Sequence, residues 1–254
     1  MRNDSVDGII DGAKKDYIDQ IIKAIRQTEN GKHTFFDTSD FPWVEKIESN
    51  WKSIRKELDH ILSTIDMLPG YEDIQSEQKI LTQDKRWKIF PFYAYGYFQE
   101  ENMRRCPETA KILQMIPGLQ AAMFSIMEAD KKIPPHVGIY CGVLRYQLAL
   151  KVPPEPTQCG IKVGNDEVNW TEGSSLIFDD THLHSAWNES DQERVVLFVD
   201  FTRPLDSPLS TLNDKVIDVI GASNFIQDAR RKWELWERDF GTELDSILSQ
   251  SRNN

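Results

Sequence analysis

The sequence has few of the residues that build disulfide frameworks or thiolate metal sites. Its 254 residues include three cysteines, Cys106, Cys141 and Cys159, which is an odd number without CxxC spacing. The Walker loop, the GxSxG nucleophile elbow and the HExxH zinc motif do not occur. These absences argue against a disulfide scaffold, a thiolate zinc site and the enzyme classes that carry those three motifs.

Positive charge and long apolar runs are also scarce. Thirty lysines and arginines stand against forty-one acidic residues, which gives a formal net charge of −11 without any basic cluster. Nucleic acids and anionic membrane surfaces are therefore disfavoured as partners. No stretch approaches the length of a membrane span, and the first residues lack the layout of a signal peptide. We expect a soluble, cytoplasmic protein.

The patterns that are present predict a β core between two helical flanks. Apolar residues recur with helical period at 14–26, 43–62 and 226–240. A β-prone aromatic stretch covers 87–98, a short helix is expected at 107–115, and further strands at 120–127, 143–152, 159–163, 174–178 and 194–201. We predict one catalytic domain over 1–254, with flanks 1–80 and 206–254 around a core at 81–205. Regularly spaced short strands are typical of a sandwich or jelly roll.

Histidine is rare, so only a few residues are candidates for a histidine-based metal site. The five histidines are His33, His60, His136, His182 and His184, and the last three lie in the β region. A long separation between His136 and the later pair lets the chain leave the core and return. Imidazole nitrogen suits iron, zinc, copper and nickel, and two histidines with an acidic or water ligand leave positions open for oxygen and a co-substrate. The alternative is that each histidine is a surface residue at a strand end.

Two arginines interrupt apolar strands. Arg145 shares one face of its strand with Gln147, because side chains alternate along a strand. Arg194 opens a strand that is apolar on both faces and is therefore expected at the centre of a sheet. A guanidinium matches a carboxylate, so Arg194 is a candidate anchor for a dicarboxylic acid. The alternative is an ion pair with Asp191 or Glu193.

Three further polar residues lie near these positions. Asp179 and Asp180 precede the second histidine pair and point to opposite faces of an extended chain. We expect them to orient a turn or a histidine rather than to bind metal. Ser125 is the one hydroxyl in an otherwise apolar strand. Its partner is either a backbone carbonyl or a ligand.

Four motifs carry a family resemblance. They are Pro135-His-Val-Gly, the run that begins Gly142-Val-Leu-Arg-Tyr-Gln, the run from Trp170 through Asp-Asp-Thr-His-Leu-His to Asn188, and Asp191-Gln-Glu-Arg-Val-Val-Leu-Phe-Val-Asp-Phe. Between about Phe36 and Leu205 the sequence resembles the aspartyl/asparaginyl β-hydroxylases, which are Fe(II)- and 2-oxoglutarate-dependent oxygenases on a double-stranded β-helix, the cupin-like jelly roll. It is also similar to the bacterial lipid A acyl-chain hydroxylases.

The resemblance implies roles for individual residues. His136 and His184 correspond to the iron ligands, and His182 is left without a role. Arg194 corresponds to the arginine that binds the distal carboxylate of 2-oxoglutarate, and Ser125 to the hydroxyl that assists it. Arg145 corresponds to a further arginine of the co-substrate site, where Gln147 replaces the usual histidine.

The residue at position 138 differs between groups of oxygenases that use iron and 2-oxoglutarate. Most such oxygenases carry a carboxylate ligand two residues after the first histidine, whereas this chain has Gly138. The aspartyl/asparaginyl β-hydroxylases have glycine there too, and two histidines and water hold their iron.

The implied activity is hydroxylation of an aliphatic carbon with Fe(II), O2 and 2-oxoglutarate, giving succinate and CO2. Gly138 and the net charge favour the β-carbon of Asp or Asn in a peptide, protein or small molecule. The alternatives are an acyl chain of lipid A or another fatty acyl lipid, and a non-catalytic cupin-like binding protein. A pocket rich in Arg and Lys would indicate the amino acid, and a long apolar groove would indicate an acyl chain.

Overall fold

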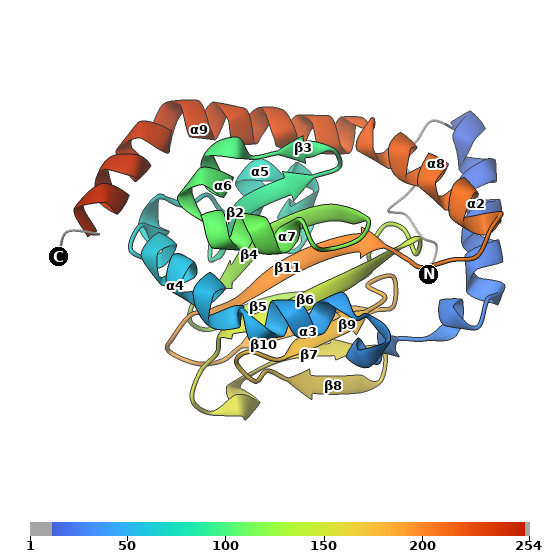
Figure 1. Ribbon diagram of the computed structural model, residues 1–254, viewed down its shortest axis with the longest axis horizontal. Helices are drawn as coiled ribbons and strands as arrows, with labels where there is room; N and C mark the ends of the chain where they lie inside the picture. The colour runs from blue at the N-terminus through green and yellow to red at the C-terminus, as the bar shows by residue number, and fades with distance from the viewer. Residues whose placement is uncertain (1–11, 252–254) are drawn as a thin grey trace.

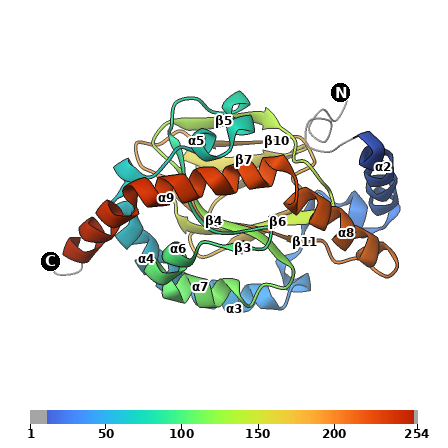
Figure 2. The same cartoon turned by 90° about the horizontal axis from the view of Figure 1, so that it is seen from above.

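In the computed structural model, which describes residues 12–251, two antiparallel sheets pack together and helices surround them (Figure 1 and Figure 2). The larger sheet has seven strands in the order β1-β9-β6-β11-β4-β2-β3, and the smaller has four in the order β5-β10-β7-β8. Side chains from both sheets share one apolar cluster. This two-sheet arrangement confirms the predicted jelly-roll core with flanking helices.

The strands of the larger sheet include the long ones that the sequence predicted. They are β1 (Phe35–Phe36), β2 (Trp87–Ala94), β3 (Tyr97–Phe98), β4 (Leu119–Met127), β6 (Val143–Lys151), β9 (Ser175–Phe178) and β11 (Arg194–Thr202). The smaller sheet contains β5 (Lys131–His136), β7 (Cys159–Val163), β8 (Asp166–Asn169) and β10 (His184–Asn188).

The helices cover the outer face of the larger sheet and one end of the molecule. They are α2 (Gly12–Gln27), α3 (Trp43–Ser49), α4 (Trp51–Leu62), α5 (Tyr71–Ile74), α6 (Glu100–Arg105), α7 (Pro107–Leu113), α8 (Leu209–Gly221) and α9 (Asn224–Ser251). Short 3-10 turns are η1 (Asn30–Lys32), η2 (Thr38–Asp40), η3 (Ile65–Met67), η4 (Ser76–Ile80) and η5 (Pro156–Gln158). Figure 1 shows the long α9 lying across the end of the sheet beside β2 and β3.

Alternation along the strands gives the larger sheet two apolar faces. Phe124 and Leu197 project outward onto α3, α4 and α7. Met123 and Phe198, their neighbours in sequence, project inward among side chains of β7. Because both faces are covered, residues 195–199 of β11 are all apolar, as the sequence pattern predicted.

Two predicted segments are interrupted. The helix expected over 43–62 breaks at Asn50, whose side-chain amide donates a hydrogen bond of 2.7 Å to the Lys46 carbonyl and so ends α3. The strand expected over 87–98 turns at Tyr95 and Gly96, where φ is 44° and 93°. A glycine adopts this left-handed backbone without steric penalty, so the chain reverses there into β3.

Four strands were missed because their sequences are short or rich in proline. Pro134 and Pro135 lie within β5, and a proline cannot donate a backbone hydrogen bond to a neighbouring strand. The order of the smaller sheet places β5 at its edge, where the missing donors are tolerated. The other three, β1, β8 and β10, have only two, four and five residues.

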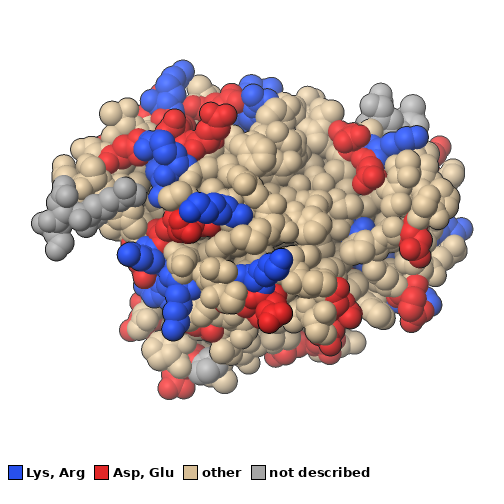
Figure 3. Space-filling model, viewed as in Figure 1, with Lys and Arg blue, Asp and Glu red and all other residues tan. Residues whose placement is uncertain are grey.

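Several expectations from composition can be compared with the described residues. Cys106, Cys141 and Cys159 are all buried, and none of them forms a disulfide with another described residue. Within 12–251, no helix has the length and apolar character needed to cross a membrane. Figure 3 shows acidic and basic side chains intermixed on one face, without a continuous basic surface. The expectations that concern residues 1–11 and 252–254 lie outside the described residues.

Candidate active site

The two histidines assigned to metal lie side by side. His136 is the last residue of β5 and His184 the first of β10, and these two residues pair across the strands. Their ring centroids are 4.0 Å apart. The Nδ1 atom of His136 bonds the Pro134 carbonyl at 2.8 Å, and that of His184 bonds the His182 carbonyl at 2.9 Å. Because a carbonyl only accepts, each proton lies on Nδ1 and each Nε2 keeps its lone pair.

Burial keeps both imidazoles neutral. Loss of water, followed by the neighbouring His184, lowers the pKa of His136 to about 3. Loss of water, followed by the charge of Arg145, lowers the pKa of His184 to about 4. A metal binds the neutral ring, so these residues are ready to act as ligands at neutral pH. Among residues 12–251, however, no three side chains of His, Cys, Asp or Glu converge as a metal cluster.

The other predicted site residues all project from the inner face of the larger sheet. Arg145 and Gln147 lie on β6, Ser125 on β4 and Arg194 on β11. The register pairs Arg194 with Met127, two residues along β4 from Ser125. The structure therefore brings these four side chains to the same interior, between the sheets.

Arg194 is a buried cation without an acidic partner. Its side chain is 3% exposed, its Nε has no hydrogen-bond partner, and no ion pair links it to a described carboxylate. It contacts the Met127 sulfur and lies over the Trp170 ring, 5.4 Å from the centroid. Burial lowers the pKa of Arg194 to about 10. The alternative ion pair with Glu193 does not form, since Glu193 binds Lys151 instead.

Ser125 has an apolar environment and one side-chain partner. The Trp87 indole Nε1 donates a hydrogen bond of 3.0 Å to the Ser125 hydroxyl oxygen. Because that oxygen accepts, the hydroxyl proton is left to be donated elsewhere. Gln147 is also buried, and its Oε1 atom has no hydrogen-bond partner in the part of the chain that the structure describes. Both residues thus offer polar atoms to a ligand.

Arg145 differs from Arg194 because two carboxylates already bind it. Its guanidinium contacts Asp200 at 2.9 and 3.1 Å and Asp180 at 2.7 Å. Burial raises the pKa of both aspartates, although the charge of Arg145 opposes this shift. The three side chains form a partly buried cluster with one more acidic than basic group. The sequence did not reveal this cluster, since Asp180 and Asp200 lie on different segments from Arg145.

Asp180 also explains the glycine at position 138. The Gly138 amide donates a hydrogen bond of 2.7 Å to the Asp180 carbonyl. A Cβ atom at position 138 would lie 2.2 Å from the Asp180 Cγ and from both carboxylate oxygens. Only glycine leaves room for this carboxylate, which fills the space that a side chain at 138 would take.

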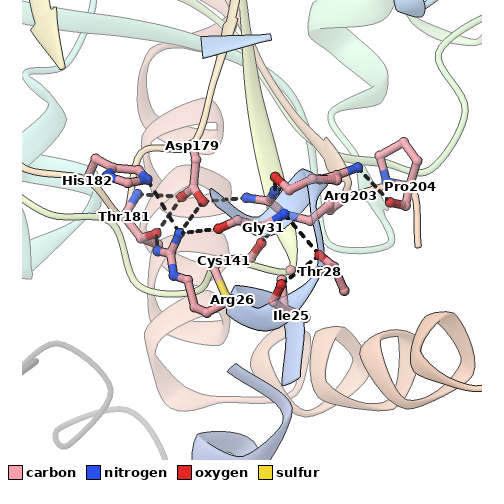
Figure 4. A network of polar contacts seen from close by, with 12 residues as sticks. Ile25, Arg26, Thr28, Gly31, Cys141, Asp179, Thr181, His182, Arg203 and Pro204 are labelled. Atoms are coloured by element: carbon pink, nitrogen blue, oxygen red, sulfur yellow. Dashed lines mark hydrogen bonds and ion pairs between the residues drawn. The ribbon is translucent and has the colours of Figure 1, made fainter. Parts of the chain in front are cut away.

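Asp179 turns to another set of partners, as the alternation predicted. Figure 4 shows its carboxylate between the guanidinium groups of Arg26 and Arg203, with the backbone amide of Thr181 bound at 3.0 Å. Asp179 and the Arg203 side chain are fully buried. His182 lies in the same network, 3.5 Å from Arg26. The network holds the segment that ends at His184, and the local sequence gave no signal that Arg26 or Arg203 would join it.

A cavity of about 220 Å³ has His136 in its lining. Arg145, Asp180 and Asp200 also line it, and most of its other lining side chains are apolar or aromatic. These include Trp87, Ile89, Pro91, Tyr93, Tyr95, Ala121, Met123, Tyr140, Phe198, Ile220, Phe225, Ile226, Ala229 and Trp233. No lysine lines it, and its second arginine, Arg230, is partly exposed at 38%.

These features define a double-stranded β-helix with a paired-histidine site and an adjacent apolar cavity. A sequence model of the aspartyl/asparaginyl β-hydroxylases matches residues 48–204. The chain is 39% identical over 228 residues to an ornithine lipid ester-linked acyl 2-hydroxylase of Rhizobium tropici, covering 90% of this chain and 81% of that protein. The chain belongs to the aspartyl/asparaginyl β-hydroxylase family, a family of hydroxylases.

Other relatives are more distant. The human aspartyl/asparaginyl β-hydroxylase is 30% identical over 170 residues, which is 65% of this chain and 22% of that protein. This chain thus spans about a fifth of that protein's length. Among solved structures, the cupin domain of Cnp3 from Schizosaccharomyces pombe is 13% identical with a TM-score of 0.34, covering 54% of this chain and 72% of that one.

Proposed function

We propose that the protein is an Fe(II)- and 2-oxoglutarate-dependent dioxygenase that hydroxylates the acyl chain of a polar lipid. The observation that carries this proposal is the apolar cavity that begins at His136. The Rhizobium tropici relative, an ornithine lipid ester-linked acyl 2-hydroxylase, supports the same substrate class. The β core and both helical flanks act as one catalytic domain in this proposal, because all three contribute to the cavity lining.

The histidine pair fits an iron ion. His136 and His184 offer two neutral nitrogen donors whose orientation is fixed by backbone carbonyls. Two protein donors leave positions open for a co-substrate and O2. The carboxylate beside position 138, Asp180, is bound by Arg145. We therefore assign His136 and His184 as the protein ligands.

Arg194 and Ser125 fit the distal carboxylate of 2-oxoglutarate. A carboxylate would supply the charge that the buried guanidinium of Arg194 lacks, and the fork of an arginine matches it in geometry. Ser125 has a hydroxyl proton to donate to the same group. Gln147 offers a further polar atom nearby. Two carboxylates already neutralise the charge of Arg145. Its role is therefore to hold Asp180 and Asp200 in place.

Iron, O2 and 2-oxoglutarate supply, when bound, an oxidant able to hydroxylate an unactivated carbon, with succinate and CO2 as co-products. The protein's own contribution is positioning and the exclusion of water. The apolar walls of the cavity would hold an alkyl chain against the histidine end. The Asp179 network keeps His184 in place opposite His136.

The charges in the cavity favour an acyl chain over an aspartate or asparagine substrate. An amino-acid carboxylate would need a free cation near His136, but Arg145 is occupied by two aspartates. The excess acidic group of that cluster would repel an anionic substrate. Most of the other side chains in the cavity wall are apolar or aromatic, which suits an acyl chain. The cavity therefore favours an acyl chain as substrate, whereas the sequence favoured an Asp or Asn side chain.

Hydroxylation of an Asp or Asn side chain is the second candidate. Gly138 favours it, because the resemblance links glycine at this position to the aspartyl/asparaginyl β-hydroxylases. The human relative supports it as well, through its name and a match over 65% of this chain.

The test is a turnover assay with the full chain, Fe(II), ascorbate and 2-oxoglutarate. One arm contains an acylated ornithine lipid in detergent, and the other contains aspartate- and asparagine-containing peptides. We expect succinate and an oxygen atom added to the acyl chain, both dependent on 2-oxoglutarate, in the first arm alone. Hydroxylation of the peptides alone would establish the second candidate. No product in either arm, with no spectroscopic complex of iron and 2-oxoglutarate, would leave a binding protein.

A further inference from the structure

One wall of the cavity comes from helices that lie beyond the β core. Ile220 belongs to α8, and Phe225, Ile226, Ala229 and Trp233 belong to α9. The family match ends at residue 204, before either helix begins. The match to the Rhizobium tropici protein covers 90% of the chain, so it must include part of 209–251. The part of the cavity wall that α8 and α9 form therefore lies outside the residues that match the family model.

The spacing on α9 turns one side of the helix to the cavity. Ile226, Ala229 and Trp233 follow one another at three- and four-residue steps, which places them on one face. Leu235, on another side, is 48% exposed and does not line the cavity. Trp233 is 3% exposed and stacks on Trp236 at 4.7 Å.

Ion pairs hold this helix in position along its length. Arg105 of α6 has a side chain only 2% exposed and binds Glu237 at 2.7 Å and Asp245 at 2.9 Å. Leu244 and Leu248 are buried in the main apolar cluster. A wall fixed by these contacts can set the size of the cavity, because it cannot simply move aside for a larger ligand.

The opposite wall is the inner face of the sheet. Ile89 and Pro91 of β2 and Ala121 and Met123 of β4 line the cavity there. Arg230 of α9 and Tyr97 of β3 also line the cavity, and the Arg230 guanidinium stacks over the Tyr97 ring at 3.8 Å. The cavity thus lies between the sheet and α9, with His136 in its lining.

We propose that α8 and α9 select the acyl chain, with Ala229 setting the length of chain that the cavity accepts. This inference rests on the proposed function for its substrate class. Ala229 has the smallest side chain on the α9 wall, so the space beside it is available to a ligand. Each additional methylene buried there strengthens binding about fourfold. A larger residue at 229 would remove that space and with it the advantage of longer chains.

The test measures binding without turnover, using the full chain without iron or 2-oxoglutarate. The probes are octadecanoyl and decanoyl chains on a glycine headgroup, each carrying bromine in the chain. Bromine quenches indole fluorescence at short range, and Trp87 and Trp233 both line the cavity. Ala229→Phe is compared with Leu235→Phe, which adds an aromatic ring to the same helix outside the cavity lining. Circular dichroism melting establishes that both variants fold.

We expect the wild-type chain and Leu235→Phe to bind the octadecanoyl probe more tightly than the decanoyl probe. Ala229→Phe should weaken octadecanoyl binding by about fifteenfold, the effect of about two methylenes, and decanoyl binding by less than about twofold. Equal weakening of both probes would overturn the inference, and so would affinities that match those of Leu235→Phe.

Turnover of the same proteins separates this inference from the proposed function. If the wild-type chain binds by length as described but yields no hydroxylated lipid, the proposed function fails and the selecting role of α9 stands. If it hydroxylates lipids and Ala229→Phe keeps the wild-type preference for chain length, the proposed function stands and the selecting role fails.

Discussion

The carboxylate of Asp180 occupies the space that a side chain at Gly138 would need. A Cβ atom at 138 would lie 2.2 Å from the carboxylate carbon, and the Gly138 amide binds the Asp180 carbonyl at 2.7 Å. This contact joins the end of the segment that follows His136 to the segment that leads into His184. The glycine thus helps to align the two histidines.

Substitution of Gly138 by alanine should therefore disturb the site. The added methyl group clashes with the Asp180 carboxylate, which is tied to Arg145, so the two segments must move apart. We expect the free energy of unfolding to fall by about 1–3 kcal/mol, the usual range for overpacking. Urea unfolding of the wild-type and Gly138→Ala proteins measures this change.

The double variant Gly138→Ala with Asp180→Ala is the control for this prediction. Removal of the carboxylate opens the space for the new methyl group, so the combined loss should be smaller than the two single losses added together. Strictly additive losses would show that the two residues do not interact in this way.

Metal binding should depend on His184 and not on His182. His184 pairs with His136, whereas His182 lies beside Arg26 in the Asp179 network. We expect His184→Ala to lose at least about nine-tenths of its bound iron, because one of only two protein donors is gone. His182→Ala should keep its iron within about twofold. Metal analysis of the purified proteins decides between them, and the reverse pattern would show that the ligands are wrongly assigned.

Arg194→Met should weaken 2-oxoglutarate binding without weakening the fold. Loss of a charge-assisted hydrogen bond of about 1.5–3 kcal/mol corresponds to a KM for 2-oxoglutarate raised roughly ten- to hundredfold. Because the guanidinium is buried without an acidic partner, its removal should leave the Tm of the ligand-free protein unchanged or higher. Steady-state kinetics and thermal melting measure the two effects.

Arg238→Met is the matched control, since Arg238 is exposed and pairs with its neighbour Asp239 on α9. It should leave both KM and Tm as in the wild-type protein. If 2-oxoglutarate raises the Tm of Arg194→Met as much as that of the wild-type chain, Arg194 does not bind this co-substrate.

Asp179→Ala should be among the most destabilising single changes in the chain. The substitution leaves the buried guanidinium of Arg203 without its carboxylate partner. Breaking a buried ion pair in this way lowers the free energy of unfolding by about 3–5 kcal/mol. Glu167→Ala, which breaks the exposed pair with Lys162, should lower it by less than about 1 kcal/mol. Equal effects of the two changes in urea unfolding would contradict the structural role of the Asp179 network.

The sequence predicted the long strands and the direction of their side chains well. Alternation alone placed Arg145 and Gln147 on one face of β6, and the apolar pattern of 194–201 identified a central strand. These are local properties, because the extended backbone fixes the side to which each residue points. The separated histidines were also recognised as a pair with the spacing of a metal site, and the structure brings His136 and His184 together.

Other features escaped prediction because they depend on residues far apart in the sequence. Two carboxylates bind Arg145 although no local pattern connects them with it: Asp200 lies on β11, and Asp180 lies in the segment before β10. The edge strand β5 was hidden by its prolines, and its pairing with β10 is what positions His136.

The sequence by itself determined the two-sheet fold class, the inner face of the larger sheet and the short set of residues that carry chemistry. Only the tertiary structure decided which arginine is free and which is neutralised, why position 138 is glycine, and that α9 closes an apolar cavity. The physical reason is that periodicity describes a segment on its own. The charge and shape of a site arise from groups that meet only when the whole chain packs.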